Sequence, residues 1–352
     1  MENIGYFDGH NDVLLKLYHS KAQNVSKEFF DGNNFCHIDY QKIQAANFIG
    51  GFFAIFAPNK KQNFSRISSK MQKKSYNFSL PNPISYDHAI DSTNKMISIL
   101  YQILDTSEGK IVLCKNGLDF KNAYENNKVG ILLHIEGAEA IDKDFKSLEK
   151  LYELGLRSIG IVWSRSNIFA HGVPFGFPMS PDTGPGLTSL GKELVKVCDE
   201  KKILIDLSHL NEKGFWDVAN LSTKPLIATH SNSHELCQHS RNLTNTQLHA
   251  IKESKGIVGV NFATGFLRSD GQMKPDTSLD LIVQHADYLI KHLGEESVAI
   301  GSDFDGAPIP EKIKDLAGIN HLKQHLFSSG YGKELIEKIF FRNWLNFLEK
   351  NL

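Results

Sequence analysis

The stretch "VGILLHIE", residues 129–136, is a run of apolar residues that ends in a carboxylate. Short runs of this kind, rich in Ile, Val, Leu and Phe and ending in a polar or charged residue, indicate strands. Seven more occur: "IGYFD" near residue 4, "FIGGFFAIF" near 48, "SIGIVW" near 158, "ILIDLS" near 203, "PLIATH" near 225, "GIVGVNF" near 256 and "VAIGSDF" near 298. Most are followed by a stretch with helical periodicity. Eight alternating units of strand and helix predict a (β/α)8 TIM barrel of the α/β class.

The length of the chain and its glycine pattern bear on the alternatives to a barrel. The chain has 352 residues, which exceeds the usual domain size, but barrels of this length fold as one unit. An open doubly wound sheet is the alternative, yet no Gly-x-Gly-x-x-Gly follows the first strand to support a dinucleotide site. We therefore expect a single barrel domain over residues 1–352.

A long segment separates the second predicted strand from the third. Residues 57–128 begin with a polar, basic stretch and continue with helical spacing over residues 86–104 and a short apolar run, "KIVLCKN". This pattern predicts an insertion between strands 2 and 3 that contains a charged loop, a helix and a short extra strand. A Gly- and Pro-rich loop after the fourth strand is expected to overhang the catalytic rim, and Thr188 is the predicted N-cap of the helix that follows.

The composition narrows the class of partner. A formal net charge of −1 gives no electrostatic reason to expect nucleic acid or an anionic membrane, so a small neutral or zwitterionic partner fits better. The N-terminal stretch lacks a basic segment followed by an apolar one, and no run is long and uncharged enough to cross a bilayer. We expect a cytoplasmic protein and leave a homodimer open. The four widely spaced cysteines are expected to be buried free thiols.

Ligand-type side chains end five of the eight runs. "YFDGHND" at residues 6–12 places His10 and Asp12 two residues apart, on the same face of an extended strand. The others are Glu136 in "HIEG", His209 in "IDLSH", His230 in "IATHS" and Asp303 in "GSDFDG". Taken singly, the glutamate could cap a helix, the histidines could be core residues and the last aspartate a turn residue. Taken together they indicate one site, because all strands of a barrel end at a shared mouth.

The crowding of carboxylates and imidazoles in one cleft points to metal ions. Such groups are costly to desolvate without compensating positive charge, which two divalent cations would supply. Imidazole nitrogen with carboxylate oxygen favours zinc, although manganese or iron suit the same ligand types. We expect one ion at His10, Asp12 and Glu136 and a second at Glu136, His209 and His230. The predicted cofactor is thus a pair of Zn²⁺ ions bridged by the glutamate.

The ordered set "DGHND", "HIEGAEA", "LIDLSH", "THSNSHELCQHSRNLT" and "GSDFDG" resembles the renal (membrane) dipeptidase family of zinc peptidases, a branch of the amidohydrolase superfamily. The matching pieces span nearly the whole chain. The resemblance implies a (β/α)8 barrel, a binuclear zinc site with the same five ligands, and hydrolysis of dipeptides, often with a D residue at the C-terminal position. It makes Asp303 the residue beside the metal-bound water. It makes Arg241 the clamp for the substrate's terminal carboxylate, which a planar guanidinium matches in bidentate fashion.

The sequence departs from the family pattern after the fourth strand. Trp163 stands where animal members have a histidine thought to steady the oxyanion, and an indole donates one hydrogen bond but cannot carry a proton. His171 in the same loop could substitute. We therefore expect Trp163 to affect substrate binding and turnover more than metal binding. His230 and His234 have the spacing of a zincin pair, but the glutamate after the first histidine is absent, which argues against a zincin.

These residues predict hydrolysis of a dipeptide by a water that bridges two zinc ions. Asp303 would accept the proton of that water and return it to the leaving amine. Two alternatives stay open: another amidohydrolase reaction on a lactone, cyclic amide or N-acyl amino acid, and a non-catalytic metal-binding barrel. The complete set of ligands together with Asp303 argues against the second.

Overall fold

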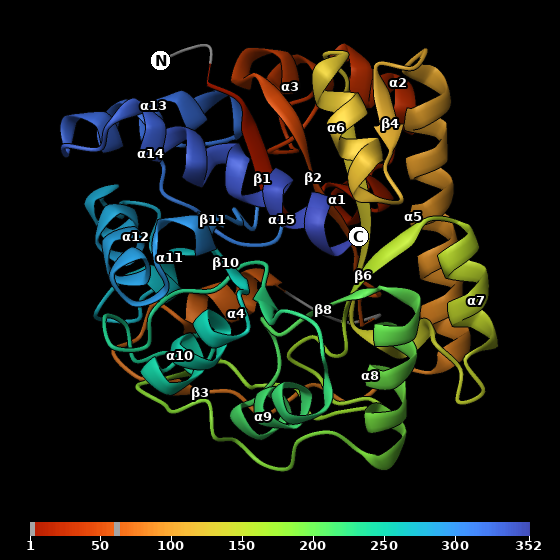
Figure 1. Cartoon of the computed structure of the whole chain (residues 1–352), viewed down its shortest axis with the longest axis vertical. Coiled ribbons are helices and arrows are strands. Elements are labelled where there is room, and N and C mark those ends of the chain that lie inside the picture. Colours follow the sequence, from red (N-terminus) through yellow and green to blue (C-terminus); the bar gives the residue numbers. More distant parts are fainter. Residues whose placement is uncertain (1–3, 60–63) are drawn as a thin grey trace.

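The computed structural model describes residues 4–59 and 64–352. Within these residues eight parallel strands follow one another around a nearly closed barrel (Figure 1). They are β1 (Tyr6–Asn11), β2 (Phe48–Ile55), β5 (Val129–Glu136), β6 (Leu156–Gly160), β8 (Leu204–Asp206), β9 (Ile227–Ala228), β10 (Ile257–Val260) and β11 (Val298–Ile300). Each coincides with one of the eight apolar runs. The predicted (β/α)8 fold is confirmed.

The barrel closes between its first strand and the segment after its last. The backbone N–H of Asp12 donates to the carbonyl of Phe304 at 2.8 Å, and the N–H of Asp303 donates to the carbonyl of His10 at 3.1 Å. Asn11 and Phe304 form an isolated parallel bridge. The seam between β1 and β11 therefore includes three residues that the sequence predicts to lie at the site, His10, Asp12 and Asp303.

Helices surround the strands (Figure 1). Their bounds are α1 (Val13–Tyr18), α2 (Val25–Asp31), α3 (Tyr40–Ala46), α4 (Phe64–Lys70), α5 (Tyr86–Thr106), α6 (Gly117–Glu125), α7 (Lys146–Glu153), α8 (Ser189–Lys201), α9 (Glu212–Leu221), α10 (Asn245–Glu253), α11 (Thr264–Leu267), α12 (Asp280–Leu293), α13 (Ile319–Ser328), α14 (Lys333–Glu337) and α15 (Asn343–Asn351). Thr188 accepts a hydrogen bond from the N–H of Gly191, which confirms the predicted N-cap of α8. Asn24, Asp39, Ser85, Asn116, Asn211 and Thr244 cap six further helices in the same way.

The segment between β2 and β5 contains the predicted helix and strand. The helix is α5, which runs two residues past the expected end at residue 104, and the strand is β4 (Ile111–Leu113), which pairs with β5. A two-residue strand, β3 (Tyr76–Asn77), pairs antiparallel with β7 (Gly176–Phe177) in the loop after β6. The insertion is thereby joined to the Gly- and Pro-rich loop, across the carboxyl ends of the barrel strands.

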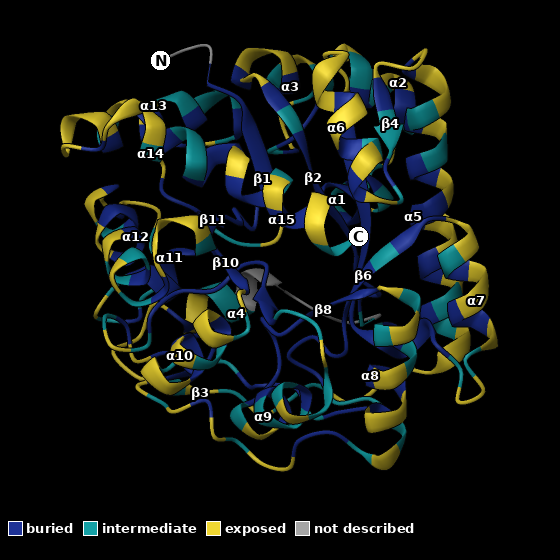
Figure 2. Ribbon diagram, in the orientation of Figure 1, coloured by how far each residue is buried: buried dark blue, intermediate teal, exposed yellow. Residues whose placement is uncertain are grey.

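The core lies in and around the strands, which are buried while the outer helix faces are exposed (Figure 2). All six residues of β1 and all eight of β5 are buried, as expected for parallel strands covered on both faces. Trp344 of α15 packs against Phe52 with ring centroids 5.0 Å apart and donates its indole N–H to the carbonyl of Ile300 at 2.8 Å. All four cysteines are buried and free, as predicted. No helix in the described part of the chain is long and apolar enough to cross a membrane.

Candidate metal centre and active site

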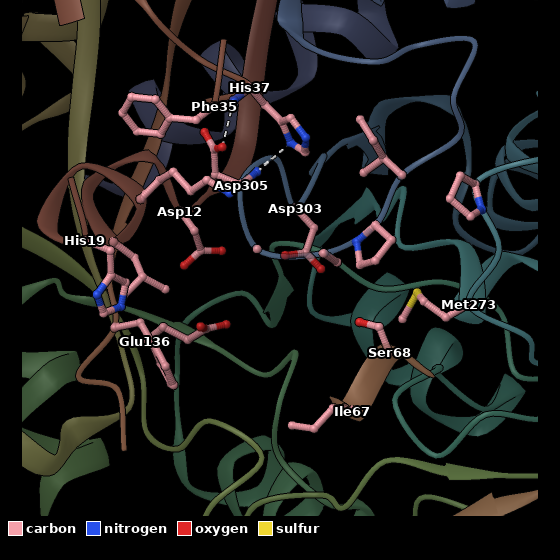
Figure 3. A pocket seen from close by; sticks show the side chains of 18 of the residues that line it. Asp12, His19, Phe35, His37, Ile67, Ser68, Glu136, Met273, Asp303 and Asp305 are labelled. Atoms are coloured by element: carbon pink, nitrogen blue, oxygen red, sulfur yellow. Dashed lines mark hydrogen bonds between the residues drawn. The ribbon is translucent and has the colours of Figure 1, made fainter. Parts of the chain in front are cut away.

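A cavity of about 930 Å³ opens at the carboxyl ends of the barrel strands. Asp12, Glu136 and Asp303 point into it from three different strand ends (Figure 3). An apolar wall faces them, made of Phe56, Ile67, Met71, Trp163, Phe175, Phe266 and Met273. The mouth also carries charged side chains, among them Lys16, Lys21, Glu28, Glu311 and Lys314. The cavity thus joins a polar floor to an apolar wall, the usual make-up of a small-molecule site.

Glu136 is the centre of the polar floor. Its Oε1 lies 3.0 Å from Nε2 of His209 and 3.5 Å from Nε2 of both His10 and His230. The glutamate ends β5, His10 lies in β1, and the other two histidines follow β8 and β9. Three predicted metal ligands therefore converge on one carboxylate oxygen of a fourth, although the four come from separate parts of the chain.

Asp12 and Asp303 complete the cluster on the β1 side. Oδ2 of Asp12 lies 3.5 Å from Nε2 of His10, and His10, Asp12 and Asp303 bring ligand-type atoms within 4.8 Å of one another. Asp303 has a left-handed backbone with φ of 61° and receives a hydrogen bond of 3.0 Å from the amide of Asn261. A Cβ at Gly306 would clash with carboxylate oxygens of both aspartates, so only glycine lets the loop pass this close.

The protein groups alone leave this cluster electrostatically unbalanced. Burial raises the pKa of Glu136 and of Asp303, because the charged forms lose their hydration. Burial and the neighbouring Arg241 lower the pKa of His209. Burial would also lower the pKa of His10, but Glu136, Asp12 and Asp303 together raise it to about 10. A cation among these groups would favour the carboxylates in their charged form and the imidazoles in their neutral form.

The residues fit a metal cofactor. Both ring nitrogens of His10 are buried without a hydrogen-bond partner among the described residues, so the one unprotonated nitrogen of the neutral ring is available to a metal. Glu136, His209 and His230 bring ligand-type atoms within 4.8 Å of one another, as do His10, Asp12 and Asp303. Imidazole nitrogen and carboxylate oxygen are the donors that zinc accepts in hydrolytic sites. The chemistry of the donors thus agrees with the predicted cofactor.

Arg241 adjoins the ligand cluster at His209, and the described residues that line the cavity do not include it. Its guanidinium is buried, donates to the carbonyl of Ser208, and lies 3.2 Å from Nε2 of His209. The Nε of Arg241 has no partner among the described residues. Burial lowers the pKa of this guanidinium to about 10, although Asp303 and Glu136 act in the opposite direction. Sequence spacing had placed Arg241 in the site but could not give the direction of its side chain.

Trp163 lies on the cavity wall, in the segment that follows β6. Its ring packs against Phe56 at 5.0 Å and faces the ring of His209 at 6.0 Å, both measured between centroids. The described residues that line the cavity do not include His171, whose Nδ1 lies 3.3 Å from the Ser166 hydroxyl. Trp163 is therefore better placed than His171 to contact a ligand.

The structure also brings to the site several polar residues that the sequence did not single out. Asp206 and His134 lie in the barrel interior, with Oδ2 and Nε2 3.8 Å apart. Asn261 holds Asp303, as described above. His37 accepts a hydrogen bond of 2.8 Å from the N–H of Asp305, whose carboxylate in turn accepts from the N–H of His37 at 2.7 Å (Figure 3). The sequence could have predicted the position of His134. It stands two residues before Glu136, so both side chains lie on the same face of β5.

Comparison with known proteins places the chain in a family. The model of the membrane dipeptidase family (Peptidase family M19) matches residues 1–351. The "uncharacterized protein in pqqA 5'region" of Klebsiella pneumoniae is 46% identical over 260 residues, which are 74% of this chain and 96% of that protein. The crystal structure of a metallo peptidase from Rhodobacter sphaeroides, liganded with a phosphinate mimic of the dipeptide L-Ala-D-Ala, is 42% identical and covers 99% of both chains with a TM-score of 0.97. Dipeptidase AC, a metallo peptidase of family M19, is likewise 42% identical over 99% of both chains, with a TM-score of 0.96.

The chain belongs to the membrane dipeptidase family, Peptidase family M19. The resemblance inferred from five short motifs is confirmed, and family membership supports a metal-dependent hydrolase.

Proposed function

We propose that this protein hydrolyses dipeptides, including those with a D residue at the C-terminal position, at a site that holds two zinc ions. His10, Asp12 and Glu136 would hold one ion, and Glu136, His209 and His230 the other. When bound, such a pair of ions lowers the pKa of a water between them and polarises the scissile carbonyl. The observation that carries the proposal is the position of Glu136, whose one oxygen lies 3.0 to 3.5 Å from three imidazole nitrogens of a buried cluster.

Asp303 is the proposed general base and acid. Its carboxylate lies in the cavity beside Asp12, within reach of any water held by the ligand cluster. Without metal, burial raises the pKa of this carboxyl. With cations in the cluster the carboxylate form is favoured, and that form can accept a proton from water and then release it to the leaving amine. The amide of Asn261 donates to its Oδ2, which keeps the other oxygen available.

Arg241 is the proposed clamp for the terminal carboxylate of the substrate. The lone pair on Nε2 of His209 can serve either an N–H of Arg241 or a metal ion, but not both. Metal binding at His209 would therefore release one guanidinium N–H, in addition to the Nε that is unpartnered among the described residues. A carboxylate that accepted from both would form a bidentate, charge-assisted contact, which an internal amide of a longer peptide cannot reproduce.

The substrate class is supported by the comparison and by the cavity. The Rhodobacter sphaeroides relative was crystallised with a mimic of L-Ala-D-Ala. In this chain Trp163 and Phe266 give the cavity an apolar wall beside the polar floor, which could take the side chains of the two residues. The guanidinium of Arg241 lies 5.4 Å from the ring of Phe266, so the C-terminal residue of a clamped substrate would lie near that part of the wall.

The test is a substrate panel on protein of known zinc content. L-Ala-D-Ala and L-Ala-L-Ala would be compared with L-Ala-D-Ala amide, which differs only in the group that Arg241 would bind, and with N-acetyl-D-Ala and a γ-lactone. We expect release of free alanine from the dipeptides, a much lower kcat/KM for the amide, and loss of activity after chelation that returns on adding zinc. No turnover of any dipeptide, together with hydrolysis of the lactone or the N-acyl amino acid, would overturn the proposal.

A further inference from the structure

Asp206 is a buried aspartate at the end of β8 that the proposed reaction does not use. Four protein groups donate to its carboxylate. They are the backbone N–H groups of Ser208 at 3.1 Å and Thr229 at 2.8 Å, and the hydroxyls of the same residues at 2.7 Å and 2.6 Å. Three of these bonds end on Oδ1, and the Thr229 hydroxyl alone donates to Oδ2. The carboxylate is thus held in place by protein donors, and its ligand-type oxygen lies within 4.8 Å of ring nitrogens of His10 and His230.

The hydroxyl of Thr229 connects Asp206 to the ring of His230. A hydroxyl has one proton, and that of Thr229 is donated to Oδ2 of Asp206. The same oxygen lies 2.8 Å from Nδ1 of His230 and must therefore accept from it. Nδ1 of His230 thus carries the ring proton. Nε2 then has a free lone pair, and Nε2 is the nitrogen that faces Glu136 and His209.

The hydroxyl of Ser208 connects the same carboxylate to the backbone of His230. It donates to Oδ1 of Asp206 and accepts from the N–H of His230 at 3.2 Å. Asp206 therefore fixes both the backbone position of His230 and the protonation of its ring.

His209 is the other histidine of the same predicted metal site, and no hydroxyl links its ring to a carboxylate among the described residues. Nδ1 of His209 lies 3.0 Å from the hydroxyl of Ser164. No further hydrogen bond of that hydroxyl is found among the described residues, so it can donate or accept, and either tautomer of His209 is compatible with it. In the metal-free protein a guanidinium N–H of Arg241, which can only donate, faces Nε2 of His209 and favours the same tautomer there. The contrast therefore singles out His230 as the ligand whose tautomer is fixed by a carboxylate acting on Nδ1, away from the metal-binding nitrogen.

We propose that Asp206 is a positioning residue for metal binding. It acts through the Thr229 hydroxyl to hold the ring of His230 in the tautomer with a proton on Nδ1, so that Nε2 is ready to bind the second metal ion. The inference rests on the proposed assignment of His230 as a metal ligand, but not on the substrate. Carboxylates that orient metal-binding histidines commonly change metal affinity by 10- to 100-fold when they are removed.

Asp206→Asn is the informative variant because it reverses the donor and the acceptor in two hydrogen bonds. They are the bond between residue 206 and the Thr229 hydroxyl and the bond between that hydroxyl and Nδ1 of His230. The amide oxygen can still accept from the backbone N–H groups of Ser208 and Thr229, so the local fold keeps its bonds. The amide NH2 then replaces Oδ2 and donates to the Thr229 hydroxyl. That hydroxyl must now donate to Nδ1 of His230, which moves the ring proton to Nε2 and blocks the metal-binding lone pair.

The experiment measures zinc affinity and the tautomer separately. Zinc bound per chain is titrated against a chelator of known affinity for wild type, Asp206→Asn, Thr229→Val and Thr229→Ser. We expect Asp206→Asn to weaken one of the two zinc ions by 10- to 100-fold. Thr229→Val should have a smaller effect, because Nδ1 still faces Asp206 at 3.8 Å. Thr229→Ser keeps the hydroxyl and should match wild type.

The tautomer is read from metal-free protein whose histidine rings are labelled with ¹⁵N, with the His230 signals assigned by their loss in His230→Gln. The proton should lie on Nδ1 in wild type and on Nε2 in Asp206→Asn. Asp199→Asn is the matched control, since Asp199 of the outer helix α8 also accepts from a hydroxyl and a backbone N–H, those of Ser222 and Thr223. It should change neither readout.

Two results would overturn the inference. One is a Nδ1–H tautomer in Asp206→Asn with weakened zinc, since Asp206 would then act as a ligand itself or through the fold. The other is equal zinc affinity in Thr229→Val and Thr229→Ser, a comparison that remains valid even where Asp206→Asn does not fold. Neither measurement uses a substrate, so a failure of the dipeptidase proposal would be seen in the substrate panel and not here.

Discussion

Two buried aspartates support opposite sides of the ligand cluster, and they do so in different ways. Asp206 reaches the ring and the backbone of His230 through two hydroxyls. Asp8 of β1 instead accepts from the N–H and the hydroxyl of Ser302, at 2.8 Å and 2.6 Å, and from the N–H of His10 at 3.3 Å. These bonds hold the backbone at the seam between β1 and β11, and none of them reaches the ring of His10, whose nitrogens are unpartnered among the described residues.

The difference shows that similar side chains in one barrel serve separate purposes. Asp8 contributes to closure of the barrel, while Asp206 contributes to the orientation of an imidazole. The two sides should therefore respond differently to the same substitution, and the predictions below are ordered from the largest expected effect to the smallest.

The largest effect is expected at Asp303, which lies on the side of the seam. Asp303→Asn keeps the shape and the bond from Asn261 but cannot accept a proton, so kcat should fall about 10³-fold. Zinc content should stay at the wild-type value, since the proposed ligands are untouched. Steady-state kinetics and metal analysis on the same sample check this, and loss of zinc in parallel with activity would make Asp303 a ligand and not the base.

The pH dependence of stability should distinguish Asp8. Burial, the largest influence, raises its pKa from 3.8 to about 6, so the folded state binds more protons than the unfolded state between these values. In metal-free protein its contribution to the free energy of unfolding is therefore largest below pH 4 and falls by about 3 kcal/mol as the pH rises to about 6. Urea unfolding of wild type and Asp8→Asn from pH 4 to pH 7 should give a difference with this slope. A difference that does not vary with pH would contradict it.

The same substitution at the two aspartates gives the most direct comparison. In Asp8→Asn the hydroxyl of Ser302 can accept from the new amide and turn its proton to the carbonyl of His10, 3.3 Å away. No ring proton moves, so zinc affinity should stay within about 3-fold of wild type, against the 10- to 100-fold loss expected for Asp206→Asn. Equal losses of zinc affinity in the two variants would contradict the view that Asp8 serves barrel closure while Asp206 orients the ring of His230.

A substrate effect without a metal effect is expected at Arg241, on the side of Asp206. Arg241→Ala should lower kcat/KM for L-Ala-D-Ala by about 10- to 100-fold, the value of a charge-assisted contact of about 1.5 to 3 kcal/mol. The kcat/KM for L-Ala-D-Ala amide should hardly change, because the amide offers no carboxylate. Equal decreases for both substrates would assign Arg241 to support of His209 instead.

The smallest effect is expected at Ser164. Its hydroxyl contacts Nδ1 of His209 but does not impose a tautomer, so Ser164→Ala should weaken zinc by only a few-fold. Chelator competition on Ser164→Ala and Thr229→Val compares how much zinc affinity is lost when the hydroxyl beside His209 or beside His230 is removed. A larger loss for Ser164→Ala would mean that His209, and not His230, is the oriented ligand.

The sequence predicted what depends on strand periodicity and missed what depends on contacts between strands. Glu136 and His10 could be placed because each ends or nearly ends an apolar run, and all such ends meet at one rim. Asp206 lies in the run "ILIDLS" and could be read only as part of a strand. Its function depends on Thr229 of the next strand lying beside it, which follows from the register and not from spacing along the chain. Spacing along the chain likewise does not show that the guanidinium of Arg241 lies 3.2 Å from Nε2 of His209 and 5.4 Å from the ring of Phe266.

The positions of the ligands along the chain have a consequence for biosynthesis. His10 leaves the ribosome early and Asp303 almost last, and the seam that joins them forms only when β11 is present. A nascent chain that stops before β11 therefore carries all five proposed zinc ligands but has neither the closed ring nor Asp303. Catalytic activity should therefore appear only when β11 and Asp303 have joined the barrel, which is later than the synthesis of His230, the last of the proposed zinc ligands.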